Sequence, residues 1–123
     1  MQKKDSRGKD QTIQGKEDMV TYSFVEGKLS LPVNNIIYIE TYRHKNLFHT
    51  RTNTYSLYRK LNEIEEDLKD KGFLRTHLSY LVNMHYIEKI SSYVLTLSDG
   101  KELSVPKARY KAVKQRYNQF LER

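Results

Sequence analysis

Hydrophobic and polar residues alternate with a two-residue period over most of the chain after residue 18. Such alternation is typical of strands that bury one face, and the segments concerned are rich in β-branched and aromatic residues. The pattern predicts strands over residues 20–25, 29–31, 36–42, 47–52, 73–77, 80–83, 87–91, 93–97 and 102–105. Turn residues such as Gly27, Asn53 and Gly100 separate these strands, so we expect a mostly β protein.

Two stretches follow a helical period instead. The first predicts a central amphipathic helix over residues 58–71, whose apolar stripe is formed by Leu57, Leu61, Ile64 and Leu68. Ser56 is expected to cap this helix at its start, and Gly72 is expected to end it. The second predicts a short C-terminal helix after Pro106, with a stripe formed by Tyr110, Val113, Tyr117 and Phe120.

The first 18 residues differ from the rest, because they are polar, mixed in charge and lack an apolar period. We interpret residues 1–18 as a disordered lead, an interdomain linker or a cloning remnant, and residues 19–123 as one folded domain. The longest apolar run, residues 36–39, falls far short of the ~20 residues that a membrane span requires. Without a secretory signal or any cysteine, the chain is expected to be cytoplasmic, with no membrane partner.

Charge is distributed unevenly along a chain whose net charge is +7. Residues 41–62 and 103–121 contain no Asp or Glu but many Lys and Arg. The predicted central helix gathers most of the nearby acids, which we expect on its solvated faces: Glu63, Glu65, Glu66, Asp67 and Asp70. This segregation favours one face toward an anionic partner, although a generally basic, solvated surface would give similar counts.

Catalytic chemistry finds little support in the sequence. The four histidines, at positions 44, 49, 77 and 85, lack the helical spacing and nearby carboxylates of a metal site. A nuclease would need clustered carboxylates that face inward to hold Mg²⁺, and no glycine-rich phosphate loop is present. We therefore expect no enzyme activity, no cofactor and no bound metal.

Two polar segments are candidates for binding. The first is interpreted as a loop between two strands that presents five side chains able to form hydrogen bonds: Tyr42, Arg43, His44, Lys45 and Asn46. The second opens the C-terminal helix with three cations: Lys107, Arg109 and Lys111. An ordinary hairpin tip and the polar face of a helix remain the alternatives for these segments.

A third segment carries a family resemblance. Residues 73–83 read Phe-Leu-Arg-Thr-His-Leu-Ser-Tyr-Leu-Val-Asn, with Arg75, His77 and Ser79 in an Arg-x-His-x-Ser pattern. This pattern resembles the signature of the LytTR family, the DNA-binding output domains of bacterial response regulators of the LytR/AgrA type. The strand at 36–40, the helix up to Gly72 and the basic residue after the last strand follow in the same order. The resemblance covers residues 19–121.

The resemblance implies an elongated arrangement of small antiparallel sheets, about ten strands in all, with one central helix and a short C-terminal one. It implies sequence-specific binding to double-stranded DNA, with loops that enter successive major grooves. The contacts would come from the 42–46 loop, from Arg75 to Ser79, and from Lys107. Leu78 and Lys107 depart from the polar residue and the Arg that are common there, which affects base preference more than binding.

The same resemblance implies partners. The expected partners are a promoter with direct repeats and an N-terminal receiver domain that is absent from this chain. The domain would be able to bind such a promoter as a dimer. Two alternatives use the same basic patch: an RNA-binding module, since ten Tyr and four Phe offer stacking surfaces, and a domain that binds an acidic protein.

Overall fold

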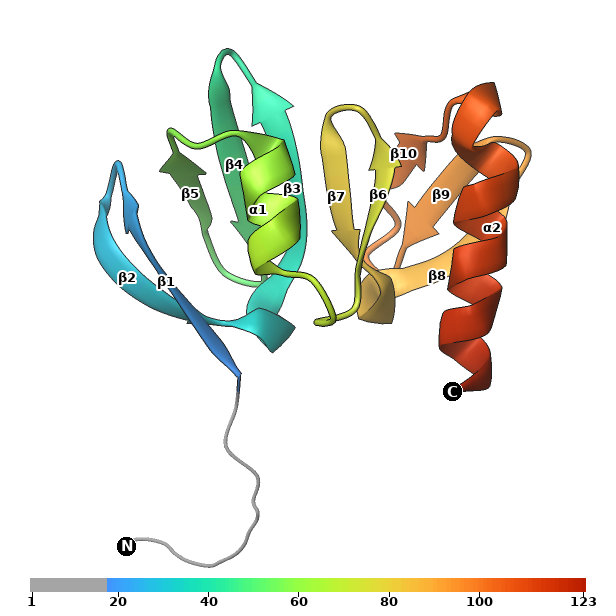
Figure 1. The fold of residues 1–123 in the computed structure, drawn as a ribbon, viewed down its shortest axis with the longest axis horizontal. Coiled ribbons are helices and arrows are strands. Elements are labelled where there is room, and N and C mark those ends of the chain that lie inside the picture. Colours follow the sequence, from blue (N-terminus) through green and yellow to red (C-terminus); the bar gives the residue numbers. More distant parts are fainter. Residues whose placement is uncertain (1–17) are drawn as a thin grey trace, which may run out of the picture.

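A computed structural model describes residues 18–123, and within them three antiparallel sheets lie side by side along the longest axis (Figure 1). The first sheet is a hairpin of β1 (Met19–Phe24) and β2 (Gly27–Pro32). The central sheet has the order β5-β4-β3-β7-β6. Its strands are β3 (Ile36–Tyr42), β4 (Lys45–Thr50), β5 (Thr54–Leu57), β6 (Phe73–His77) and β7 (Tyr80–Asn83). The third sheet holds β8 (Ile87–Ser91), β9 (Val94–Leu97) and β10 (Glu102–Ser104).

Two 3-10 helices and two α-helices complete the described fold. The 3-10 helices η1 (Val33–Asn35) and η2 (Met84–Tyr86) each lead into a strand. The α-helices are α1 (Leu61–Asp67), beside the central sheet, and α2 (Lys107–Glu122), beside the third sheet (Figure 1). The mostly β class with ten strands and two α-helices confirms the expected fold. The C-terminal helix, at sixteen residues, is the longer of the two rather than a short one.

The middle strands of the central sheet supply two hydrophobic cores. Strands β3 and β7 pair Tyr38 with Val82 and Ile39 with Leu81. Because successive side chains point to opposite faces, Tyr38 and Val82 join the core with the third sheet and α2. Ile39 and Leu81 join the core with the first hairpin and α1. The hairpins of the central sheet are thereby held on both faces.

The central helix begins later than the sequence predicts. Leu57 belongs to β5, and α1 begins at Leu61 after an N-cap, Lys60, that forms no side-chain hydrogen bond within the described residues. The expected cap, Ser56, lies in β5 and donates its N–H to Glu26 Oε1 at 2.9 Å. The spacing of Leu57 and Leu61 fits a helix, but Leu57 pairs with β4 as part of strand β5. The prediction that residues 58–60 are helical was therefore wrong.

The end of the helix is also different. Its last residue is Asp67, and a turn follows in which Asp70 and Gly72 have φ values of 66° and 86°. Gly72 therefore supplies the left-handed conformation, but it leads into β6 rather than ending the helix directly.

Three of the acids of this segment are engaged rather than simply solvated. Glu63 and Asp67 form ion pairs with Arg59 at 3.2 and 2.8 Å, and Asp67 accepts a hydrogen bond from the Tyr22 hydroxyl at 2.7 Å. Burial, together with this bond, raises the pKa of Tyr22. Glu65 pairs with Arg75 at 2.8 Å. The expectation of a merely solvated acidic face is thus corrected, because these carboxylates hold arginines in place.

Candidate nucleic-acid interface

The hairpin of β3 and β4 ends in a tight turn. Tyr42 pairs with Lys45, which leaves only Arg43 and His44 between the strands, with φ values of 51° and 67°. Two consecutive left-handed residues define a type I′ hairpin turn, which glycine or asparagine usually occupies. The 42–46 loop of the sequence interpretation is therefore a two-residue turn. Because the left-handed conformation costs roughly 1–2 kcal/mol per non-glycine residue, the two side chains are kept at an energetic cost.

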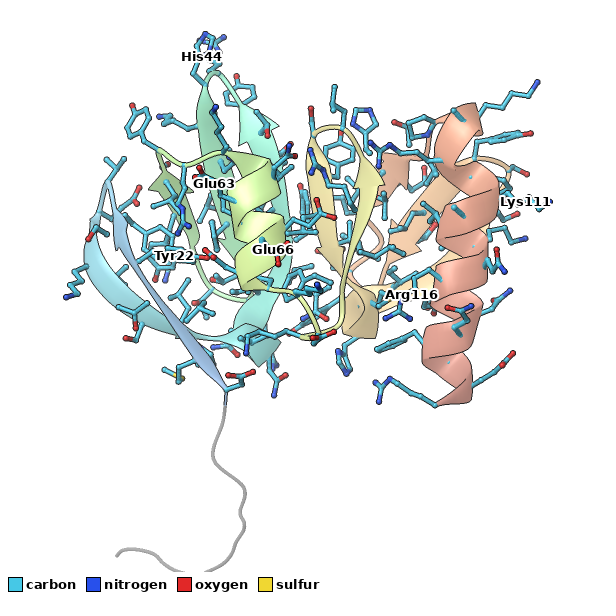
Figure 2. The ribbon with its side chains drawn as sticks, in the orientation of Figure 1. Tyr22, His44, Glu63, Glu66, Lys111 and Arg116 are labelled. Atoms are coloured by element: carbon cyan, nitrogen blue, oxygen red, sulfur yellow. The ribbon has the colours of Figure 1, made fainter. Side chains whose placement is uncertain are left out.

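The side chains of this hairpin divide into two groups. Tyr42, Arg43 and His44 are exposed, with the Arg43 guanidinium 5.3 Å from the centre of the Tyr42 ring, and Lys45 is half-buried. His44 stands at the extreme tip (Figure 2). Asn46 is instead 4% exposed, and it accepts a hydrogen bond from Thr41 Oγ1 at 2.7 Å.

Asn46 ties this hairpin to a neighbouring segment. Its side-chain amide donates to the Arg59 carbonyl oxygen, in the loop that precedes α1. The sequence interpretation placed Asn46 among five presented side chains, whereas the structure turns it inward. The alternation of β4 contained this signal, because Asn46 lies two residues before the fully buried Phe48 and therefore shares its face.

Arg75 lies in β6, one strand of the β6–β7 hairpin, and its side chain is held by the protein itself. Its side chain is 11% exposed. Nη1 donates to Asn62 Oδ1 and to Glu65 Oε1, both at 2.8 Å, while the other guanidinium nitrogens donate to the His77 and Leu78 carbonyl oxygens. The guanidinium thus braces the turn against α1.

His77 and Ser79 order the turn itself. The His77 Nδ1 accepts the Ser79 N–H at 3.0 Å, and its ring lies 4.6 Å from that of Tyr80. The Ser79 carbonyl oxygen accepts the Thr41 N–H at 2.9 Å, which joins the two hairpins near their tips. Leu78, 70% exposed, is the side chain that this arrangement presents outward.

The third region is the start of α2. Pro106 precedes the helix, Lys107 and Lys111 are exposed one turn apart, and Arg109 is half-buried. The helix begins at the edge of the molecule where the β3–β4 and β6–β7 turns lie, and it runs toward the opposite edge (Figure 1). The three predicted regions therefore share one edge of the domain.

A groove of about 480 Å³ joins the two hairpin tips. None of the described residues that line it is acidic. They are Thr41, His44, Asn46, Tyr58, Arg59, Lys60, Leu61, Asn62, Arg75 and Leu78. The sequence interpretation missed Tyr58 and Lys60, because it assigned position 58 onward to the helix. The polar run that these residues form with Arg59, just before Leu61, was the available signal for a loop.

The histidines and carboxylates of the described residues do not gather into a metal site. Among residues 18–123, no three or more His, Asp or Glu lie close enough together to hold a metal ion. His49 is occupied within the sheet, where it pairs with Glu40 at 2.6 Å and stacks on Tyr38. No helix in this range has the length and apolar character needed to cross a membrane.

Exposed turns and a cationic helix start along one edge of a β domain are typical of a nucleic-acid-binding module. The sequence profile of the LytTr DNA-binding domain family matches residues 26–118, and the chain belongs to this family. The description of this family names a DNA-binding domain. A solved LytTr DNA-binding domain from Bacillus cereus has a TM-score of 0.68 and 24% identity, covering 84% of this chain and 97% of its own.

Curated relatives are transcriptional regulatory proteins. NatR of Bacillus subtilis (strain 168) is 36% identical over 63 residues, 51% of this chain and 27% of NatR. YpdB of Escherichia coli (strain K12) is 28% identical over 105 residues, 81% of this chain and 43% of YpdB. LytR of Staphylococcus aureus (strain N315) is 29% identical over 89 residues, 68% of this chain and 36% of LytR. The chain thus spans less than half the length of each of these relatives.

Proposed function

We propose that this domain binds double-stranded DNA sequence-specifically through the edge that carries its two hairpin turns and the start of α2. The observation that carries the proposal is that the two hairpin turns and the cationic start of α2 share one edge, with the strained residues Arg43 and His44 exposed at one tip. Strained residues persist where the surrounding structure enforces them, and such sites are frequently functional. Membership of a DNA-binding family supports the same reading.

The side chains of the edge are assigned different roles. His44 and Arg43 would reach base edges in a major groove, where their N–H groups can donate to guanine or adenine acceptors. Tyr42 and Lys45, at the strand ends, would contact phosphates. Leu78, exposed but unable to donate a hydrogen bond, suits a thymine methyl group.

The remaining predicted residues act on the same interface by other means. Lys107 and Lys111 would bind phosphates at the start of α2, with Arg109 half-buried beside them. Asn46, Arg75, His77 and Ser79 bond within the protein, so we assign them to positioning the two tips.

The wider biology follows from the relatives. Since the named relatives are transcriptional regulatory proteins, we propose that this domain acts as a cytoplasmic transcription-regulator output domain without catalytic activity. Its DNA would be a promoter with direct repeats, bound by a dimer, and its regulatory partner an N-terminal receiver domain. No observation favours RNA or an acidic protein as the ligand.

Selection of bound sequences from random duplex DNA tests this function. We expect an enriched motif with a fixed repeat spacing, and duplex DNA that outcompetes single strands and RNA of the same sequence at fixed salt. No enrichment, or equal competition by RNA and other polyanions, would overturn sequence-specific DNA binding.

A further inference from the structure

The loop between β5 and α1 carries two side chains that nothing in the described structure employs. Tyr58 is 71% exposed, and its ring contacts no other aromatic ring or cation among residues 18–123. Lys60 is exposed and forms no ion pair within the same range. Both residues line the groove between the two hairpin tips.

Arg59, between these two residues, is anchored on the protein side. Its guanidinium pairs with Glu63 and Asp67, and its carbonyl oxygen accepts the Asn46 side-chain amide. The backbone at Lys60 is extended, with φ −67° and ψ 140°, and the side chains of Tyr58 and Lys60 are exposed. The anchored Arg59 thereby fixes the backbone from which Tyr58 and Lys60 project, which lowers the entropic cost of binding through them.

The chemistry of the groove selects a ligand class. Its described lining contains no carboxylate, while the two guanidinium groups present, of Arg59 and Arg75, are already neutralised by acids outside the lining. The ammonium of Lys60 and the hydroxyl of Tyr58 are exposed groups of this lining that can bind a ligand. An ammonium without an ion pair among residues 18–123 and a phenol hydroxyl, both lining a groove whose described lining has no carboxylate, suit a phosphodiester oxygen.

We propose that the β5–α1 loop is a further DNA-contact region, in which Lys60 and Tyr58 hold one backbone phosphate between the two hairpin tips. The proposal rests on the DNA binding proposed above. The contact would carry no base information, and it would fix the position of the β3–β4 turn relative to the duplex.

The test compares Lys60→Gln with Lys101→Gln, which makes the same change of charge. Lys101 is exposed and lies in the turn between β9 and β10. The Ser98 N–H of the same turn donates to the Tyr86 carbonyl oxygen in η2, which follows the end of β7 opposite the hairpin tips. We expect Lys60→Gln to reduce the magnitude of the negative slope of log affinity against log salt by about 0.9, and to weaken binding about eightfold at 0.1 M salt. The loss should be equal for selected and unrelated duplexes, and Lys101→Gln should match the wild type.

Two further measurements sharpen the result. Tyr58→Phe should weaken binding about two- to tenfold, the range for one hydrogen bond exchanged with water. Ethylation of individual phosphates should identify one position that lowers wild-type binding but not binding by Lys60→Gln. Both side chains are exposed, so neither substitution should change the melting temperature.

The outcomes separate this proposal from the one it rests on. Wild-type binding that is weak and insensitive to salt would overturn DNA binding, and this contact with it. Salt-dependent wild-type binding with Lys60→Gln and Tyr58→Phe indistinguishable from Lys101→Gln would overturn this contact alone. A loss confined to one base pair, or a loss of transcription activation with unchanged DNA affinity, would also overturn it, in favour of a base contact or a protein partner.

Discussion

Arg43 and His44 hold left-handed backbone conformations that a glycine would adopt more readily. We expect His44→Gly to leave the free energy of unfolding unchanged or to raise it by up to about 1 kcal/mol, because strain is relieved while chain entropy is lost. Binding should nevertheless weaken by about 1–3 kcal/mol, with base preference relaxed at one position. Thermal unfolding and affinities for single-base variants of a selected site measure the two effects.

Ser92→Gly provides the matched control. Ser92 has a φ of 53° in the turn between β8 and β9, and it has no proposed contact with DNA. Its substitution should change stability as His44→Gly does, with DNA affinity unchanged. If His44→Gly bound and discriminated like the wild type, the β3–β4 turn would not be a base-reading element.

Glu65 and Glu66 are adjacent acids with different surroundings, and they give a second prediction. Glu65 pairs with the largely buried Arg75, whereas Glu66 lies 4.0 Å from the exposed Lys69. Glu65→Gln should lower the free energy of unfolding by about 1 kcal/mol and weaken DNA binding, because the brace on the β6–β7 turn loosens. Glu66→Gln should do neither. Equal effects of the two substitutions on stability and affinity would show that Arg75 does not depend on its carboxylate partner.

Thr76 has a fully buried hydroxyl oxygen with no hydrogen-bond partner among the described residues. It lies where β6 shifts register against β7, between Arg75 and His77. Because an unsatisfied buried hydroxyl is costly, Thr76→Val should keep or raise the free energy of unfolding, by up to about 1 kcal/mol. Chemical denaturation would measure this. A clear loss of stability would mean that the hydroxyl is hydrogen-bonded in solution.

At the scale of elements, α1 is the scaffold that both hairpins share. Ile64 is fully buried and Leu61 is 5% exposed, in the core with the central sheet. Ile64→Ala or Leu61→Ala should cost about 2–5 kcal/mol of stability, since each removes core volume. Denaturant unfolding, with the exposed Glu66→Ala as the control, measures the cost. A loss below about 1 kcal/mol at both positions would show that this helix packs loosely.

The strands were the part of the fold that the sequence predicted best. Residues 73–77, 80–83 and 87–91 match β6, β7 and β8, because alternation and turn residues agree there. The sequence prediction placed the start of α1 too early. Leu57 and Leu61 are four residues apart, as in a helix, although Leu57 belongs to β5. Only the long-range pairing of β5 with β4 decides between helix and strand, and local patterns do not contain it.

The candidate site was predicted as segments rather than as side-chain roles. The sequence located the two hairpins and the start of α2, but not that Asn46 and Arg75 face the protein. Those orientations depend on partners distant in the chain, such as Arg59 for Asn46 and Glu65 for Arg75. Tyr58 lines the groove together with Asn46 and Arg75, which these contacts hold in place.

At the scale of the whole molecule, the two cores do not form independent units. Strands β3 and β7 supply Tyr38 and Val82 to one core and Ile39 and Leu81 to the other. The hairpin turns that we assign to DNA extend from these same two strands. The interface is therefore carried by the best-buried part of the fold, while the first hairpin and α2 flank it on either side (Figure 1).

This shared position has a consequence for amide hydrogen exchange. Ile39 and Leu81 lie on paired strands that supply side chains to both cores, so we expect the protection of their backbone amides to report global unfolding. Amides of the β1–β2 hairpin, which borders one core only, should exchange through smaller, local openings. Exchange followed by NMR as denaturant is added would separate the two classes. If β3 amides exchanged as early as those of β1, the domain would open as two halves, and the DNA-binding edge would lie on the hinge between them.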